Sequence, residues 1–197
     1  MAYTDVVQLK KYLKITTSGD DALLGTLATR AQELIDSYCG RSFEGSNADR
    51  TFDSVRDVDE RDSRILHLDR DLASINTITN GDGSTIASTK YVTEPRNDGP
   101  FHAIRLLDSS GLAWEYDSTL GNSENAITVN GVWAWSATAP NTIVQAAERL
   151  AGYIYRQREN TPDLDRALIA GNATVLPSTI PADIKWILDP YRRRVYA

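Results

Sequence analysis

The side chains that most often carry catalysis are scarce in this chain, whose 197 residues include two histidines and one cysteine. Neither His67 nor His102 has a second ligand at the spacing of a metal motif, so we interpret both as structural or solvent-facing. Cys39 closes a predicted helix, where the helix dipole disfavours the thiolate that a nucleophile needs. A single cysteine also excludes an internal disulfide. These residues favour no nucleophilic enzyme and no metal or other cofactor.

Acidic side chains are a second possible source of chemistry. Asp108, Glu115 and Asp117 are a candidate carboxylate cluster for two-metal hydrolysis, but nothing in their spacing fixes them on one face, and solvated turn positions explain them more simply. The stretch 53–62, DSVRDVDERD, superficially resembles a calcium loop, yet it lacks the glycine at the sixth position and the closing glutamate. We interpret it as a charged surface and predict that the protein is not an enzyme.

Four aromatic residues are the remaining candidates for a ligand site. Trp114, Tyr116, Trp133 and Trp135 fall in or beside segments rich in β-forming residues, where exposed rings can stack on a sugar or a base. Trp133 and Trp135 share the parity of one strand, which favours a place in the core or an interface. A carbohydrate-binding module therefore stays open as an alternative, and it requires Trp114 or Trp133 to be exposed.

The formal net charge of −6 is unevenly distributed. Residues 1–140 hold 13 Lys and Arg against 21 Asp and Glu, a balance of −8, whereas residues 141–197 hold 8 against 6, a balance of +2. An acidic body is a poor partner for phosphates, so stable nucleic-acid binding is not expected. The basic and aromatic end, YRRRVYA at 191–197, is interpreted either as a solvated terminus or as a tail that docks on an acidic partner.

Membrane insertion and secretion are not expected. No run approaches the roughly 18 apolar residues that a membrane span needs. The N-terminal residues MAYTDVVQLKKYL lack the basic region and apolar stretch of a secretory signal. Together with the single cysteine, these features predict a soluble protein of a reducing compartment with no membrane partner.

Helical spacing of apolar residues marks the N-terminal part of the chain. A short helix is expected over residues 4–13 with Thr4 as its cap. A longer helix is expected from a capping box formed by Ser18 and Asp21 as far as Cys39, and Gly40 then supplies the left-handed residue that ends it.

Helical spacing returns after Pro140, and this helix is apolar on several sides. We therefore expect it at the centre of a bundle or under a neighbouring subunit. Residues 161–179 are predicted to form a polar loop, and a last short helix is expected to begin at Pro181. The residues expected on the main apolar face of the long helix are Ile143, Ala147, Leu150, Ala151 and Ile154.

The middle of the chain has the composition of short antiparallel strands. Its segments are rich in Ile, Val, Thr and aromatic residues, and the cluster NGDG at 80–83 predicts a hairpin turn. The fold class predicted is α+β, a helical bundle of residues 1–43 and 137–197 with an inserted antiparallel β subdomain at 44–136. Strands are expected at 50–55, 65–68, 75–80, 85–92, 104–107 and 126–135.

Three blocks of sequence occur in a characteristic order. The first comprises DVVQLKKYLKI at 5–15, DDALL at 20–24 and AQELIDSYCGRSF at 31–43. The second comprises ITVNGVWAW at 127–135, Pro140 and the helix ending in YRQR at 155–158, and the third is IPADIKWILDPYRR at 180–193. Their order and spacing resemble the head–tail connector, or adaptor, proteins of tailed double-stranded DNA bacteriophages, although Ala134 occupies a position where that family often has glycine.

The resemblance implies a structural role in a virion. Such adaptors assemble as a homo-oligomeric ring, usually a dodecamer, beneath the portal protein, where they extend the DNA channel and dock stopper or tail-completion proteins. Genomic DNA passes through such a channel transiently and without specific binding. The resemblance also implies synthesis in the cytoplasm of an infected bacterium and a final place in the neck of the particle.

The family's C-terminal segment reaches toward the portal, so the resemblance assigns portal docking to the end of this chain. Another neck or tail-completion protein is the nearest alternative within the structural class. Residues 108–125 and 161–179 are hypothesised to become ordered on assembly. The residues expected to dock on the portal are Tyr191, Arg192, Arg193, Arg194 and Tyr196.

Overall fold

The computed structural model describes residues 3–160, 168–170, 173–175 and 180–193. The chain divides into two compact units. One, the helical unit, joins Met1–Gly40 to Ala139–Ala197, and the other, the β unit, is Arg41–Thr138. The chain combines helices with small antiparallel sheets, and the predicted α+β class is confirmed.

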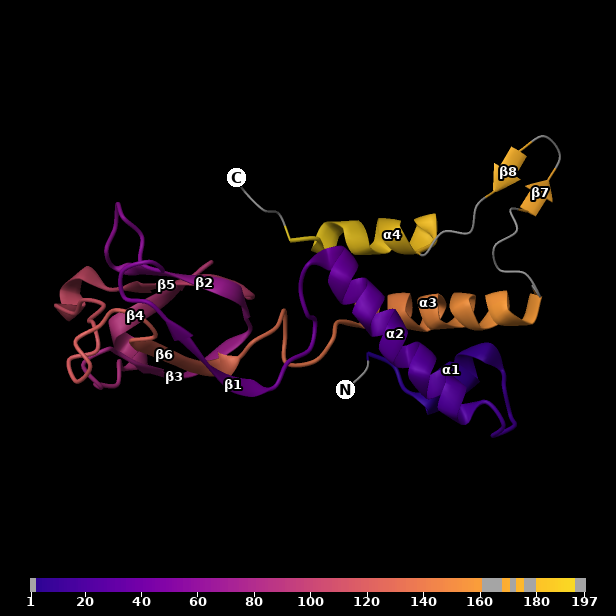
Figure 1. The fold of residues 1–197 in the computed structure, drawn as a ribbon, viewed down its shortest axis with the longest axis horizontal. Coiled ribbons are helices and arrows are strands. Elements are labelled where there is room, and N and C mark those ends of the chain that lie inside the picture. The colour runs from indigo at the N-terminus through magenta and orange to yellow at the C-terminus, as the bar shows by residue number, and fades with distance from the viewer. Residues whose placement is uncertain (1–2, 161–167, 171–172, 176–179, 194–197) are drawn as a thin grey trace. The chain divides into compact units, whose positions relative to one another are not determined.

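The helical unit is built around its longest helix (Figure 1). That helix, α3, contacts each of the other three helices, and a 3₁₀ turn at Asp189–Tyr191 follows α4. The four helices are α1 (Val6–Leu13), α2 (Asp21–Cys39), α3 (Asn141–Asn160) and α4 (Ala182–Leu188).

The helix ends differ in part from the caps expected. Asp5, not Thr4, caps α1, because its carboxylate accepts the backbone N–H of Gln8 at 2.7 Å. The capping box is also wrong, since Asp20 occupies the N-cap of α2 without a side-chain bond. The predicted end of α2 is confirmed, with Gly40 at a φ of 67° and its N–H donating to the carbonyl of Asp36.

The apolar circumference of α3 is explained within the chain. Ile143, Ala147 and Leu150 are fully buried, and Ala151 is 1% exposed. The helix was expected either at the centre of a bundle or under a neighbouring subunit, and the structure places it at the centre of the helical packing. A Cβ added at Gly152 would lie 3.2 Å from the side chains of Leu13 and Tyr12, so the glycine permits the close approach of α1.

Two short strands lie in the stretch expected to be a loop. They are β7 (Leu168–Ala170) and β8 (Ala173–Val175), an antiparallel pair in which Ile169 is opposite Thr174. Sequence periodicity missed them because three residues are too few to establish alternation. The rest of 161–179 lies outside the described residues.

The β unit contains two three-stranded antiparallel sheets. One has the order β1-β6-β3 and the other the order β2-β5-β4, so strands distant in sequence pair with each other. Short 3₁₀ turns occur at Ser88–Lys90 and Asp108–Ser110. The strands are β1 (Asn47–Phe52), β2 (Ile65–Leu72), β3 (Ser74–Thr79), β4 (Tyr91–Glu94), β5 (Phe101–Leu106) and β6 (Ile127–Val132).

The expected hairpin turn is present, but the strand expected after it is not. The Asn80 N–H donates to the carbonyl of Ser84 at 2.8 Å, and the returning chain pairs only briefly with β3 before the 3₁₀ turn at Ser88–Lys90. Gly81 is required because an added Cβ would lie 2.1 Å from the carbonyl oxygen of Glu115. The turn is therefore packed against the segment that precedes β6.

Large aliphatic side chains from both sheets form the core of the β unit. Alternate residues of β6 point inward, with Ile127 and Val129 fully buried, as the period of a strand requires. Trp114 adds an aromatic ring to this core from the segment between β5 and β6. The other members include Phe52, Leu66, Leu72, Ile78, Ile104 and Leu106.

Candidate docking segment and the polar network of the β unit

The candidate docking residues follow directly on the 3₁₀ turn after α4. Tyr191 is half-buried, and Arg192 and Arg193 are exposed. Arg194 and Tyr196 lie outside the described residues. The structure therefore describes three of the five residues expected to dock, and it brings them together at one end of the helical unit.

Three contacts anchor this segment, residues 189–193, on the C-terminal end of α2. The Tyr38 hydroxyl donates to Oδ1 of Asp189 at 2.6 Å, and this hydrogen bond raises the pKa of Tyr38. The Arg193 N–H donates to the carbonyl of Cys39 at 2.8 Å. The Arg192 guanidinium lies 5.2 Å from the centre of the Tyr38 ring. We call residues 189–193 the anchored segment.

The position of the anchored segment is electrostatically favourable. The last turn of α2 contains no basic residue of its own, and its terminal carbonyls carry the negative end of the helix dipole. Arg192 and Arg193 place positive charge beside that end while their side chains stay exposed. The result is a basic and aromatic surface held on a rigid helix, which suits recognition of an acidic partner.

Sequence reasoning missed a further exposed aromatic residue in the same part of the chain. Trp186 on α4 is 80% exposed, whereas Ile184 and Leu188 on the same helix are buried. The spacing of the two buried residues already placed Trp186 on the opposite face of the helix. The apolar residues at 184 and 188 of the sequence therefore indicate which face of this helix is exposed.

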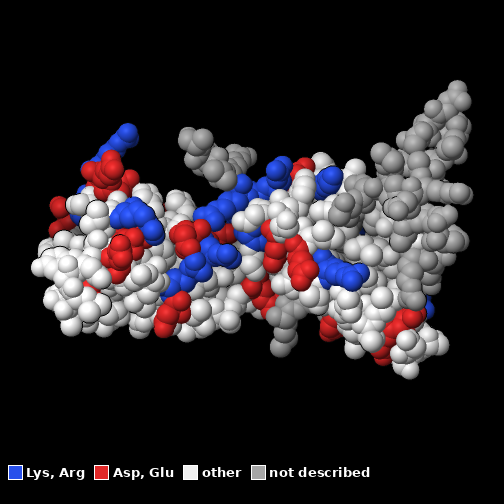
Figure 2. Space-filling view, in the orientation of Figure 1, with Lys and Arg blue, Asp and Glu red and all other residues white. Residues whose placement is uncertain are grey.

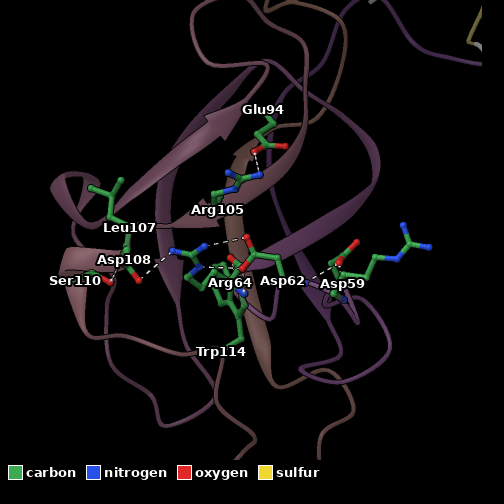
Figure 3. A network of polar contacts seen from close by, with 10 residues as sticks. Asp59, Asp62, Arg64, Glu94, Arg105, Leu107, Asp108, Ser110 and Trp114 are labelled. Carbon is green, nitrogen blue, oxygen red and sulfur yellow. Dashed lines mark hydrogen bonds and ion pairs between the residues drawn. The ribbon is translucent and has the colours of Figure 1, made fainter.

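In the β unit, charged side chains form an extended network rather than a cluster of one sign. Arg64 binds Asp62 through two nitrogens, at 2.9 and 3.1 Å, and reaches Asp108 at 3.2 Å (Figure 3). The hydrogen bond to Asp62 is the main cause that raises the pKa of Arg64, and it lowers that of Asp62. Lys and Arg likewise lie among Asp and Glu on the face in Figure 2.

The backbone of Arg64 connects this network to the core. Its carbonyl accepts the indole N–H of Trp114 at 2.9 Å and the N–H of Leu106 at 3.0 Å. On the neighbouring strands, Arg105 pairs with Glu94 at 2.8 Å (Figure 3). Such paired and bridged charges are typical of a structural surface.

One carboxylate of the network has a strongly shifted pKa. Asp59 bonds to the ring of His67 at 3.0 Å and accepts the backbone N–H groups of Asp62 and Arg61. The bond with His67 is the largest cause that lowers the pKa of Asp59, to about 2. His67 is thus a partner in a surface pair, while His102 is exposed on β5 without a metal motif.

The residues considered for chemistry do not form a reactive site. Asp108 pairs with Arg64, and Asp117 accepts the backbone N–H groups of Thr119 and Leu120 in a turn. Cys39 is 1% exposed. Within the described part of the chain, no three His, Cys, Asp or Glu residues are grouped so that they could hold a metal ion.

The tryptophans of the β unit serve its packing. Trp114 is 8% exposed, which contradicts the requirement for a sugar platform at that residue. The indole of Trp133 donates to the carbonyl of Ala48 at 3.0 Å and lies beside Arg50. Trp135 lies 6.1 Å from the ring of Phe43, and Tyr116 is exposed.

Comparison with known proteins identifies the family. The family model described as head completion protein matches residues 2–194. No curated protein matches the chain, and no helix of the described residues has the length and apolar character needed to cross a bilayer.

The fold is similar to chains from gene transfer agent (GTA) particles. One, from the neck of an empty GTA particle computed with C6 symmetry, is 16% identical, with a TM-score of 0.59 over 98% of this chain and 92% of that one. Another, from the virion of a native GTA particle, is 14% identical at the same TM-score and coverage. A third, from a native neck with C12 symmetry, is 14% identical with a TM-score of 0.55 over 97% and 90%. The predicted resemblance to head–tail connector proteins is confirmed, and the chain belongs to the head completion protein family.

Proposed function

We propose that this protein is a non-enzymatic adaptor in the neck of a phage-like particle. It forms a ring, a dodecamer in the simplest case, beneath the portal protein and offers the opposite side of that ring to a stopper or tail-completion protein. Family membership supports a role in head completion. The fold, similar to chains from GTA necks with C6 and C12 symmetry, supports a cyclic assembly.

The observation that carries the proposal is the anchored segment. Tyr191, Arg192 and Arg193 are held on the end of α2 by a hydrogen bond, a backbone contact and a ring contact, with both arginine side chains exposed. Arginine and tyrosine are favoured at the centre of protein interfaces. Because the segment starts from a fixed point, the residues that follow it, including Arg194 and Tyr196, can be directed at one partner surface.

In this proposal the two units have different roles. The helical unit is the connector core, and the β unit is a subdomain inserted between α2 and α3. Residues 41–138 hold 9 Lys and Arg against 16 Asp and Glu, a net charge of −7. An acidic unit of this kind repels phosphate, which would let DNA slide through a channel without binding.

The test is native mass spectrometry of the full chain co-expressed with the portal protein of the same particle. The chain truncated after Asp189 and the double variant Arg192→Gln/Arg193→Gln are measured in parallel. Arg30→Gln, which removes an exposed arginine from α2, is the control for charge. We expect a ring-on-ring mass for the full chain and the control, and its loss in the truncated chain and the double variant.

The alternatives give different masses. Binding to the portal that survives the truncation moves docking away from the C-terminus. A chain that ignores the portal but assembles with a tail protein identifies another neck component instead of an adaptor. A monomer under all conditions contradicts the proposal.

A further inference from the structure

Two helices of the helical unit carry highly exposed apolar side chains, which no described residue of the unit covers. Val7 on α1 is 74% exposed, and Trp186 on α4 is 80% exposed. Figure 1 shows α1 and α4 on opposite sides of α3, and α3 contacts both. An exposed tryptophan is a common anchor of protein interfaces, so Trp186 is a candidate contact residue, and Val7 is a second, separate exposed apolar position.

The charged side chains that we group with the two positions differ in sign, although Lys185, Arg192 and Arg193 lie close in sequence to the carboxylates. On α1, exposed Val7 and Lys11 are one turn apart, and exposed Lys14 is the left-handed C-cap residue that follows the helix; we call these three residues the α1 face. On α4, exposed Asp183 and Trp186 are three residues apart, and exposed Asp189 begins the turn after the helix; we call these three residues the α4 face. One face combines an apolar residue with two cations, and the other combines it with two carboxylates.

The carboxylates of the α4 face are held in position. Asp183 pairs with Arg149 of α3, and Asp189 accepts the Tyr38 hydroxyl of α2. Half of the Asp183 side chain remains exposed, so it can take a second cationic partner. The α1 face is held by the anchoring of α1, because Lys10 on its other side pairs with Asp21 at 2.7 Å.

Opposite, complementary faces on one chain are what a cyclic ring requires. In a ring, each interface is heterologous, so one surface of a subunit meets a different surface of the next subunit. We infer that the α4 face of one copy packs on the α1 face of the neighbouring copy, with the Trp186 ring against Val7 and within reach of Lys11. The partner is a second copy of this chain, and the inference rests on the ring proposed above.

The proposed contact between the α4 face and the α1 face combines apolar, cation–π and ionic interactions. A lysine ammonium over an indole face adds a cation–π contribution to the apolar contact, and Asp183 and Asp189 face the cations of the α1 face across the interface. Because it is repeated at every subunit boundary, a modest pairwise affinity is sufficient to close the ring.

The test uses two full-length variants, Val7→Asp and Trp186→Asp, each mixed with the portal protein and measured by native mass spectrometry. Both positions are highly exposed, so the fold should survive, and far-UV circular dichroism checks this. Val55→Asp, at a 71% exposed position of the β unit, is the matched control. We expect each interface variant to bind its neighbours at least about tenfold more weakly and to lose the ring, while the control retains it.

A mixture of the two variants separates this interface from others. Val7→Asp keeps an intact α4 face and Trp186→Asp keeps an intact α1 face, so the two should form a one-to-one dimer that cannot extend. Each variant alone should remain a monomer. The charge reversal Lys11→Glu should weaken the ring, and Asp183→Lys in the same chain should restore part of it.

The outcomes distinguish this inference from the proposed function. If the wild-type chain and both variants form rings alike, the ring stands and this interface is overturned. If the variants lose the ring but their mixture yields no dimer, the two residues do not face each other and the pairing is overturned. If the wild-type chain never assembles, the proposed function fails and the interface fails with it.

Discussion

The two units of this chain are stabilised in different ways. The helical unit carries 12 Lys and Arg against 11 Asp and Glu, a net charge of +1, whereas the β unit has a net charge of −7. The centre of the helical unit combines large aliphatic residues such as Leu24 and Ile143 with small ones, since Ala31, Ala146 and Ala147 are also fully buried. The β unit instead combines large aliphatic side chains with a surface network of arginine–carboxylate pairs around Arg64.

This difference indicates in which unit we expect the surfaces for assembly. Alanine and glycine let helices approach closely, and the exposed large apolar residues in the described part of the helical unit are Val7, Tyr12 and Trp186, of which Val7 and Trp186 are the most exposed. In the β unit, several arginines pair with carboxylates of the same unit, and the excess of carboxylates leaves the net charge of −7. We therefore expect ring contacts and portal docking to depend on the helical unit, and DNA repulsion on the β unit.

The strongest test of this contrast is Leu150→Ala at the centre of α3. Leu150 is fully buried, so the variant should lose about 3 kcal/mol of unfolding free energy through lost burial and a cavity. Helical circular dichroism during urea unfolding reports the loss. Gln145→Ala, at an exposed position of the same helix, should change the free energy by less than about 0.5 kcal/mol.

The same variant tests whether each unit has its own stability. Three of the four tryptophans lie in the β unit, so their fluorescence reports its unfolding separately. We expect the midpoint measured by fluorescence to stay in place when Leu150 is replaced. Equal shifts of both signals would show a single cooperative transition.

The second prediction concerns the link between the network and the core of the β unit. Trp114→Phe keeps an aromatic ring in the core but removes the hydrogen bond to the carbonyl of Arg64. It should lower the unfolding free energy by about 1 kcal/mol, because that carbonyl still accepts the N–H of Leu106. Trp186→Phe, at an exposed position, is the matched control and should leave the stability unchanged within error. Equal losses would contradict the distinction.

The elements of the two units were predictable to different degrees. Periodicity placed α2 and α3 because each spans five turns or so with a stable apolar face. In the β unit, the positions of most strands were predictable, but their order β1-β6-β3 and β2-β5-β4 was not, since pairing depends on contacts distant in sequence. The prediction of a strand at 85–92 was wrong, because tertiary contacts of the hairpin outweigh the β-propensity of these residues and a 3₁₀ turn forms at Ser88–Lys90.

The candidate docking segment was likewise only partly predictable from the sequence. The composition of residues 191–197 allowed either a solvated terminus or a docking tail, and the anchoring of this segment by Tyr38 joins residues 151 positions apart, so it could not be found from local spacing. Likewise, no sequence motif identifies Arg64 as the residue that joins Asp62, Asp108 and Trp114. The charged composition predicted a surface in this part of the chain, and the structure identifies which side chains form ion pairs on it.

A smaller effect is expected for Tyr38→Phe in the helical unit. It removes the hydroxyl that donates to Asp189, and because this pair is exposed, global stability should change by less than about 0.5 kcal/mol. The measurable result is faster hydrogen exchange of the Arg193 N–H, which donates to Cys39. Tyr153→Phe, on α3, is the matched control. Unchanged exchange at Arg193 would contradict anchoring by Tyr38.

The smallest effect should be the acid dependence of the β unit. The bonds of Asp59 to His67 and to two backbone N–H groups lower its pKa from the ordinary 3.8 to about 2. A carboxylate whose pKa is lowered on folding stabilises the fold above its ordinary pKa, and that contribution is lost as the pH falls through about 2. Asp59→Asn should therefore flatten the decline of the urea midpoint, measured by tryptophan fluorescence, between pH 4.5 and about pH 2. Asp98→Asn, at an exposed position of the same unit, should retain the full decline, and an equal slope in both variants would place the acid sensitivity elsewhere in the network.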